Sequence, residues 1–493
     1  MTPSKTLSDP PTTVPRRHDT EPSAYHWAAL PVLLSGTFLV VLDFFIVNVA
    51  LPSTQTGLHA GATALEWVVA GYGLTFAVLL IAAGQLGDRW GRRRLFLLGI
   101  ALFTLASAAC GAAPNVGALV TARLFQGAAA ALITPIVLAI IGVMFSGKQR
   151  TRAIGAYATT MGVAAAGGQL IGGVLLTADV AGLGWRSVFL INIPVGVAAL
   201  ALIPRLVPES RSAHSTRLDV SGLVLATAGL TALILPLLEG RQQGWPAWTW
   251  LSLAAAPFLI AAFVLRQRSM LAQARTPLLD LRLFGSRAFS VGMLGQFLLF
   301  CGQASYFVIL ALYLQQGRGL SAMDSGLMFT IVAVSYLYAS AKAAGLAARF
   351  GRGVVIAGAV LLAGGHLALL LTTRAVGIGG PVLAVSPGLL LAGAGMGLCI
   401  TALTVIVLQS ANAEQAGAIS GTLSTAQQVG NAVGVAIIGP IFFGALPAGY
   451  DHAFELGLEG LVCMIGALVV LTLALPARRA ASREGGLSEA PSP

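Results

Sequence analysis

The amino-acid sequence predicts an all-α polytopic membrane protein. Of its 493 residues, 56% are hydrophobic and only 10% are charged, and the mean hydropathy is +0.84. Soluble globular proteins average about 45–50% apolar and about 25% charged residues. So large an excess cannot be buried in a single soluble core, so lipid must be the solvent for much of the chain. Backbone groups in lipid must find their hydrogen bonds within the segment, so each apolar segment is expected to be a helix.

Fourteen apolar segments follow one another along the chain. Most have about 20 residues or more, enough for a helix to cross a hydrocarbon core of roughly 30 Å. We therefore expect fourteen transmembrane helices, at 27–51, 65–85, 95–113, 116–145, 151–178, 186–205, 219–238, 249–267, 287–315, 323–349, 353–373, 386–410, 415–446 and 452–476.

The basic residues orient these segments. With both termini in the cytoplasm, 23 Lys and Arg fall in inner tails and loops, four in outer loops and two within spans, which together are all 29. This bias follows the positive-inside rule, so the net charge of +11 indicates membrane anchoring rather than nucleic-acid binding. Arg outnumbers Lys by 26 to 3, which hints at a GC-rich bacterial genome and a bacterial plasma (inner) membrane.

An internal repeat divides the chain. Arg349-Phe350-Gly351-Arg352 after the tenth span matches Arg89-Trp90-Gly91-Arg92 after the second, so the first six and last six spans form two halves. Repeats of this kind are typical of secondary transporters, whose substrate site lies between the halves near the bilayer midplane. The expected division is a disordered cytoplasmic tail at 1–26, an N-terminal six-helix bundle at 27–206, a linker at 207–286 containing two extra helices (219–238 and 249–267), a C-terminal six-helix bundle at 287–476 and a second cytoplasmic tail at 477–493.

A short charged segment lies between the second and third spans. Gly84-Gln85-Leu86-Gly87-Asp88-Arg89-Trp90-Gly91-Arg92-Arg93-Arg94 reads as a cytoplasmic loop in which two glycines permit tight turns and Asp88 accepts hydrogen bonds from arginine. Such a cluster can fasten one side of a transporter in one state and release it in the other. A plain positive-inside anchor would explain the arginines but not Asp88. The repeat copy has lost the acid, so we expect Asp88→Asn to weaken inner closure far more than Arg349→Ala.

Asp43 and Arg123 are ionisable residues inside spans that point to a function. Asp43 stands in the first span, within Leu42-Asp43-Phe44-Phe45-Ile46-Val47-Asn48-Val49-Ala50-Leu51-Pro52. Burying a charge in a span costs several kcal/mol, which favours a function, here proton carriage, over a structural hydrogen bond. In the fourth span, Arg123, Gln126 and Gly127 share one helix face. Arg123 therefore couples to Asp43 or forms a fixed ion pair with it.

Other candidates are weaker. Polar side chains that could line a substrate cavity are Asn48, Glu66, Tyr72, Gln126 and Gln169. Small residues suited to close helix packing are Gly127, Gly168, Gly172 and Gly173. His366 is a lone mid-span histidine, either structural or a proton relay. None of the four cysteines has metal-ligand spacing, and no side-chain cluster has catalytic spacing. We expect no enzyme activity, no metal and no cofactor.

These motifs resemble the major facilitator superfamily, in particular its fourteen-span drug:proton antiporter branch, over about residues 27–476. The resemblance implies two six-helix bundles plus two inserted helices and a cytoplasmic gate at Gly84, Asp88, Arg89, Gly91, Arg92 and Arg93. It also implies proton coupling through Asp43 and Arg123. The sequence departs from the branch where Phe45 replaces the usual Thr and Gln169 replaces the usual Pro.

The expected function is proton-driven export of amphipathic or cationic drug-like compounds by alternating access. The partners would be a small-molecule substrate, protons and the lipid bilayer, with no nucleic acid, and the protein would be a monomer. Two alternatives stay open. The same fold could export an endogenous metabolite such as an antibiotic, a siderophore or a lipid-like product. It could also serve as a non-transporting membrane sensor.

Overall fold

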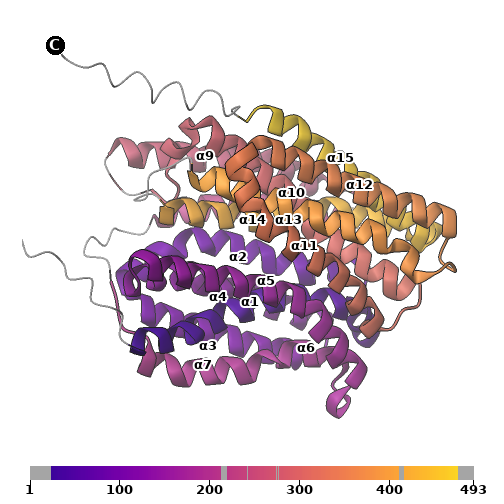
Figure 1. Ribbon diagram of the computed structural model, residues 1–493, viewed down its shortest axis with the longest axis horizontal. Coiled ribbons are helices and arrows are strands. Elements are labelled where there is room, and N and C mark those ends of the chain that lie inside the picture. Colours follow the sequence, from indigo (N-terminus) through magenta and orange to yellow (C-terminus); the bar gives the residue numbers. More distant parts are fainter. Residues whose placement is uncertain are drawn as a thin grey trace, which may run out of the picture.

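The computed structural model describes residues 24–211, 219–240, 243–273, 275, 277–409 and 416–475, and the predicted tails lie almost wholly outside them. The described chain is helical and contains no strand (Figure 1). The N-terminal bundle consists of α1 (Ala24–Leu58), α2 (Ala62–Trp90), α3 (Arg92–Gly111), α4 (Val116–Met144), α5 (Gly147–Ala178), α6 (Ser187–Leu190) and α7 (Asn192–Leu206). The C-terminal bundle consists of α10 (Arg287–Leu312), α11 (Ala322–Phe350), α12 (Arg352–Val376), α13 (Ser386–Gln409), α14 (Ala416–Ala445) and α15 (Tyr450–Leu473). Between them lies the inserted pair, α8 (Val220–Glu239) and α9 (Ala247–Ala272).

The predicted number of spans is confirmed, because fourteen helical stretches are long and apolar enough to cross a membrane. The two bundles lie side by side, the N-terminal one in the lower half of Figure 1 and the C-terminal one in the upper half. They meet along two seams, where α2 packs against α14 and α5 packs against α11. The all-α fold class predicted from composition is therefore correct.

The charged segment 84–94 is not the loop that the sequence predicted. Helix α2 continues through Gly84 to Trp90, α3 starts at Arg92, and Gly91 alone separates them. Gly91 has φ +107°, and its counterpart Gly351, between α11 and α12, has φ +53°. Both angles lie in the region that favours glycine. Two charged helix ends joined by one glycine thus replace the expected loop, and the repeat extends to a single positive-φ glycine between two helices.

The sixth span is broken where the sequence predicts one helix. Helix α6 ends at Leu190, a turn at Ile191 follows, and α7 starts at Asn192. Pro194 in the first turn of α7 has no N–H to donate to the carbonyl of Leu190, so the hydrogen-bond ladder cannot run through. The break sets the start of α7, and hence Asn192, in the core of the bundle.

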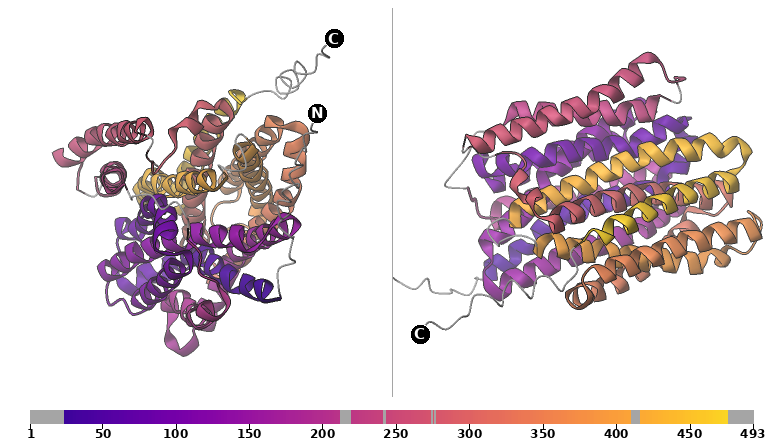
Figure 2. Two further views of the ribbon diagram at one scale, coloured as in Figure 1. Left: turned by 90° about the vertical axis from the view of Figure 1, so that its left-hand side faces the viewer. Right: turned by 90° about the horizontal axis from the view of Figure 1, so that it is seen from above.

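The inserted pair stands beside the two bundles rather than between them (Figure 2). Helix α8 packs against α2 and α14 and so covers the outside of that seam, while α9 packs mainly on α8. Exposed Leu251, Phe258 and Leu265 on α9 suit a helix that faces lipid. The pair is therefore attached through α8 to both bundles.

The bundles are hydrogen-bonded to each other at the end predicted to face outward. Gln315 Nε2 donates to the carbonyl oxygen of Val49 over 2.9 Å, and Gln316 Nε2 donates to Gln55 Oε1 over 2.7 Å. The hydroxyl of Tyr450 donates to Gln316 Oε1 over 2.5 Å. The first two bonds join α1 to the turn that follows α10, so the bundles are in contact at the end that the sequence predicts to face outward.

Candidate functional site

Asp43 and Arg123 form a fully buried ion pair in the core of the N-terminal bundle. Arg123 Nη1 lies 2.5 Å from Asp43 Oδ2, and neither side chain is exposed. Asp43 comes from the middle of α1 and Arg123 from the second turn of α4, two helices that pack against each other. The two residues that the sequence predicts to couple are thus in direct contact.

Gln126 and Asn192 bond to this pair and Ser107 bonds to both of them, while Arg123 Nη2 has no hydrogen-bond partner in the described part of the chain. Gln126 Nε2 donates to Asp43 Oδ1 over 2.8 Å, and Asn192 Nδ2 donates to the same oxygen over 2.9 Å. Gln126 Oε1 accepts from Arg123 Nη1 over 2.8 Å, while Ser107 Oγ lies 2.8 Å from Gln126 and 3.2 Å from Asn192. We call Asp43, Ser107, Arg123, Gln126 and Asn192 the buried polar cluster; it joins α1, α3, α4 and α7.

Two aromatic rings and a backbone carbonyl, contributed by α2 and α6, surround Arg123. The guanidinium carbon of Arg123 lies 4.2 Å from the ring centroid of Tyr72 and 5.8 Å from that of Phe189. Arg123 Nε donates to the carbonyl oxygen of Val68 over 3.0 Å. A cation over an aromatic face is favourable, most of all where water is excluded. The arginine is therefore held on one side by charge and on another by ring faces.

The sequence did not single out Ser107 or Asn192. A serine inside a span is common and carries little signal. Asn192 carries more, because an amide two residues before a proline, in an otherwise apolar span, must find a partner in lipid. That signal names a buried polar residue but not the residue it bonds to.

The cavity candidates from the sequence do not gather at one place. Tyr72 and Gln126 belong to the surroundings of Arg123, whereas Asn48 Nδ2 donates to the carbonyl oxygens of Phe44 and Phe45 in its own helix. Buried Glu66 on α2 lies against Gly439 of α14, at the seam between the bundles.

Gln169 on α5 is buried at the other seam, beside α11. Neither polar atom of its side-chain amide has a hydrogen-bond partner in the described part of the chain, and its carbonyl oxygen lies against Gly326 of α11. Phe45, which replaces the usual threonine of the family, packs edge-on against Phe307 of α10 at 5.3 Å. Phe307 in turn stacks on Phe329 of α11. Both departures from the family pattern therefore fall where the bundles meet.

The arginines after α2 contact an acidic residue that the sequence did not single out. The N–H of Arg93 donates to Glu209 Oε1 over 3.1 Å, and the side chains of Arg93 and Arg94 lie 3.9 and 3.7 Å from Glu209 Oε2. The N–H of Arg92 donates to the carbonyl oxygen of Ser210 over 2.9 Å. Exposed Arg89 lies in the last turn of α2, while the surroundings of Gly84 and the side chain of Asp88 fall outside the described part. The segment is thus bound to the linker that follows α7.

The small residues lie where helix backbones touch. A methyl group at Gly127 would stand 2.2 Å from the carbonyl oxygen of Tyr72, and one at Gly173 would stand 2.7 Å from the carbonyl oxygen of Ala322 on α11. Gly168 and Gly172 lie against Phe45 and Ile46 of α1. Gly127, Gly168 and Gly172 therefore permit packing within the N-terminal bundle, and Gly173 permits contact between bundles.

Known proteins with similar sequences are exporters. The chain is 38% identical to the probable actinorhodin transporter of Streptomyces coelicolor, a match that covers 86% of this chain and 74% of the relative. It is 35% identical to the cephamycin export protein CmcT of Amycolatopsis lactamdurans, a match that covers 94% of this chain and 95% of the relative. It is 34% identical to the multidrug resistance protein Stp of Mycobacterium tuberculosis, covering 85% and 76%.

Solved structures share the fold at low identity. A bacterial homologue of the human lysosomal transporter Spinster has a TM-score of 0.66 at 18% identity, covering 94% of this chain and 98% of that one. The xylose transporter XylE from E. coli has a TM-score of 0.61 at 16% identity, covering 91% and 99%. The family model described as Major Facilitator Superfamily matches residues 33–435. The chain therefore belongs to the major facilitator superfamily of multi-pass membrane transporters.

Proposed function

We propose that this protein exports amphipathic or cationic antibiotic-like compounds across the bacterial plasma membrane in exchange for protons. The observation that carries the proposal is the ion pair between Asp43 and Arg123, which is fully buried within one bundle of a transporter fold. The printed names of three relatives, an actinorhodin transporter, a cephamycin exporter and a multidrug resistance protein, support the class of cargo. Both termini would lie in the cytoplasm, as the positive-inside bias indicates.

Proton binding would act on the hydrogen bonds of Asp43. As a carboxylate, Asp43 accepts from Arg123, Gln126 and Asn192. A proton from the outer solution adds to one carboxylate oxygen, which turns an acceptor into a donor and removes the counter-charge of Arg123. A buried arginine without a counter-charge is costly, so α1, α4 and α7 must rearrange. Release of that proton to the cytoplasm restores the pair and completes one exchange.

The experiment uses inverted vesicles with an imposed proton gradient. Wild-type protein should release protons when an exported compound is added, and an uncoupler should abolish uphill efflux. We expect Asp43→Asn to lose drug-driven proton release. The double variant Asp43→Asn/Arg123→Leu keeps the core neutral, which separates loss of coupling from loss of folding. Undiminished proton release in Asp43→Asn would overturn the role of this residue.

Export of an endogenous metabolite is the second candidate. Two of the relatives are named for single compounds rather than for many drugs, which favours a dedicated cargo. A panel of compounds in a pump-deficient host separates the candidates. Efflux of several unrelated compounds supports multidrug export, efflux of one structural class supports a dedicated exporter, and no flux for any compound supports the non-transporting sensor.

A further inference from the structure

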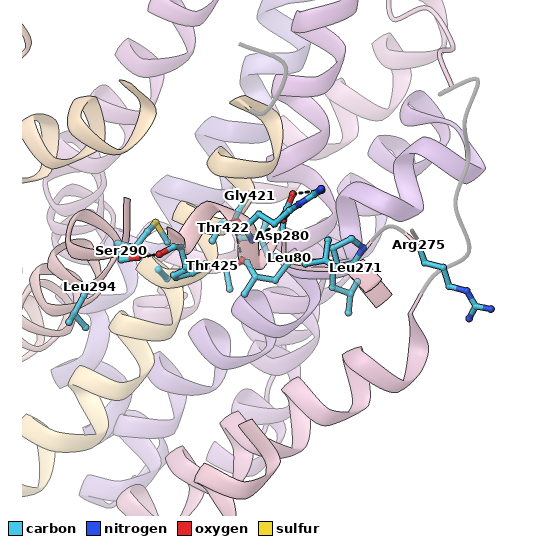
Figure 3. Close-up of a pocket in the computed structure, with 16 residues that line it drawn as sticks. Leu80, Leu271, Arg275, Asp280, Ser290, Leu294, Gly421, Thr422 and Thr425 are labelled. Atoms are coloured by element: carbon cyan, nitrogen blue, oxygen red, sulfur yellow. Dashed lines mark hydrogen bonds and ion pairs between the residues drawn. The ribbon is translucent and has the colours of Figure 1, made fainter. Parts of the chain in front are cut away.

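A pocket outside the buried polar cluster lies at the inner end of the seam between α2 and α14. Its volume is about 820 Å³. Leu80 of α2 and Leu271 of α9 form two of its walls, and the segments 277–284, 290–294 and 421–426 form the rest (Figure 3). Ligand pockets of about 300–1,000 Å³ bury most of a drug-sized molecule. The pocket therefore has the size of a binding site for a small molecule.

The lining is apolar with a few hydroxyl groups. Leucine, methionine, phenylalanine and proline side chains make most of it, and Ser290, Thr422 and Thr425 add hydroxyls. Ser290 Oγ donates to the carbonyl oxygen of Phe284 over 2.7 Å, and Thr425 Oγ1 donates to that of Gly421 over 3.0 Å. A hydroxyl that has used its hydrogen can still accept. The pocket therefore favours an apolar molecule that carries N–H or O–H donors.

The charged side chains lie at the rim of the pocket. Asp280 is paired with Arg282 at 3.0 Å, and the hydrogen bond from Arg282 holds the pKa of the Asp280 carboxyl below its usual range. The side chain of Arg282 is 74% exposed, and Arg275 points away from the other lining residues in Figure 3. The rim is therefore polar and wet, and the interior carries little charge.

The inserted pair holds this rim in place. Buried Gln267 of α9 accepts from the N–H groups of Leu278 and Leu279, over 2.7 and 3.3 Å, and donates to Asp219 over 3.0 Å. Burial opposes ionisation of Asp219, but hydrogen bonds from Gly222, Arg266 and Gln267 outweigh it and lower the pKa of this carboxyl. Asp219 is therefore charged near neutral pH, and the segment over the pocket is fixed to α8 and α9.

Both halves of the transporter take part in the lining. Leu80 belongs to the N-terminal bundle, while Met293 and Thr425 belong to the C-terminal one. A rocking motion of one bundle against the other must therefore change the shape of the pocket. A phospholipid bound to the surface of a single bundle would not contact both bundles, as the occupant of this pocket must. A pocket of this volume is also too small for two acyl chains.

We propose that this pocket is an entry site for cargo, separate from the proton site, that binds amphipathic compounds with N–H or O–H donors before export. The proposal rests on the function proposed above and names the class of compound. The inserted pair then has a direct role, since α9 and the segment that follows it complete the walls. The pocket lies at the ends of four spans, on the side that the sequence predicts to face the cytoplasm, from which cargo for export would enter.

A labelling experiment tests binding without relying on transport. Thr425→Cys is made in a Cys463→Ser background, because Cys463 is exposed while the other three cysteines are buried. The probe is ethidium, a flat cation with two amino donors, added to nanodisc-embedded protein before a maleimide. We expect ethidium to slow labelling of Thr425→Cys several-fold and to leave labelling of Ser146→Cys, at an exposed position just before α5, unchanged. Ser290→Cys reports on the same pocket if Thr425→Cys does not fold.

Equal labelling with and without ethidium at Thr425→Cys and Ser290→Cys would overturn the proposal. The proposal would also be overturned if ethidium left the labelling rate unchanged but removal of phospholipid raised it, because the pocket would then be occupied by lipid. A second arm measures ethidium efflux. Thr425→Trp fills the pocket and should raise KM several-fold with little change in kcat, while Leu265→Trp on the exposed face of α9 should change neither. If ethidium is exported but neither slows labelling nor shows a raised KM in Thr425→Trp, the entry site is wrong and the proposed function stands. If ethidium slows labelling but is not exported, the proposed function is wrong and the binding site stands.

Discussion

At the scale of single residues, the molecule concentrates its buried charge at one point. Asp43 and Arg123 are completely inaccessible, and each hydrogen bond of the carboxylate comes from a different side chain of the cluster. The sequence predicted Asp43 and Arg123 because ionisable residues in spans are rare and costly, and Gln126 because it shares a helix face with Arg123. It could not supply Asn192 as a partner, since that contact depends on the break before α7. Local pattern thus identifies buried charges, and only the tertiary fold shows how they are satisfied.

Removing one charge of the pair should destabilise the protein more than removing both. We expect Asp43→Asn or Arg123→Leu alone to cost about 3–5 kcal/mol, because each leaves a buried group of the other partner uncompensated. The double variant Asp43→Asn/Arg123→Leu should recover much of that loss. Thermal unfolding in detergent, followed by tryptophan fluorescence, measures the three variants. Additive losses in the double variant would mean that the two charges do not compensate each other.

At the scale of elements, the charged segment after α2 is the place where the structure and the prediction from sequence differ most clearly. Its composition suggested a loop, since Gly and clustered charges interrupt apolar spans. The helix continues instead, because Gly84 is tolerated inside a helix and no proline intervenes before Gly91. In the described part of the chain, Arg93 and Arg94 contact Glu209 just after α7, a contact that the sequence did not predict. A contact between residues this far apart in sequence leaves no periodic signal.

The two junction glycines offer a matched test of this contact. Alanine at Gly91 or Gly351 should cost about 1–3 kcal/mol from backbone strain alone. A methyl group at Gly91 would also stand 2.7 Å from Glu209 Oε1, whereas one at Gly351 meets nothing within 4 Å. Gly91→Ala should therefore displace Glu209 and free the N–H groups of Arg93 and Ser210, which bond to it. Hydrogen exchange at these two amides should rise in Gly91→Ala and stay unchanged in Gly351→Ala; equal exchange would contradict the role of Glu209.

At the scale of the whole molecule, polar contacts between the bundles close the end that the sequence predicts to face outward. Gln315 and Gln316 in the turn that follows α10 hold α1, and the hydroxyl of Tyr450 positions Gln316. The fold and its fourteen spans could be predicted from hydropathy and the positive-inside rule, because both report on the bilayer. Which end is closed could not, since that depends on a few hydrogen bonds of roughly 1 kcal/mol each.

Loss of these hydrogen bonds should shift the protein toward an open outer end. We expect Gln315→Leu/Gln316→Leu to reduce the free energy that favours the closed state by about 2 kcal/mol. This corresponds to a roughly thirtyfold change in the equilibrium between the closed and open states. Spin-label distances between the outer ends of α1 and α11 would report the population of each state. The control is Gln243→Leu in the loop of the inserted pair, which bonds only within that pair. Unchanged distances in the double variant would mean that other contacts close this end.

The position of α8 has a mechanical consequence. A transporter with twelve helices can rock with only lipid beside its lateral seam, and lipid flows out of the way. Here a helix of this chain touches α2 of one bundle and α14 of the other, so the same motion must slide protein against protein. Packed side chains have discrete arrangements rather than a continuum, so sliding of this kind is stepped and has a barrier. In the proposed transport cycle the inserted pair would therefore slow alternation, and changes to the face of α8 should alter turnover without touching the buried polar cluster.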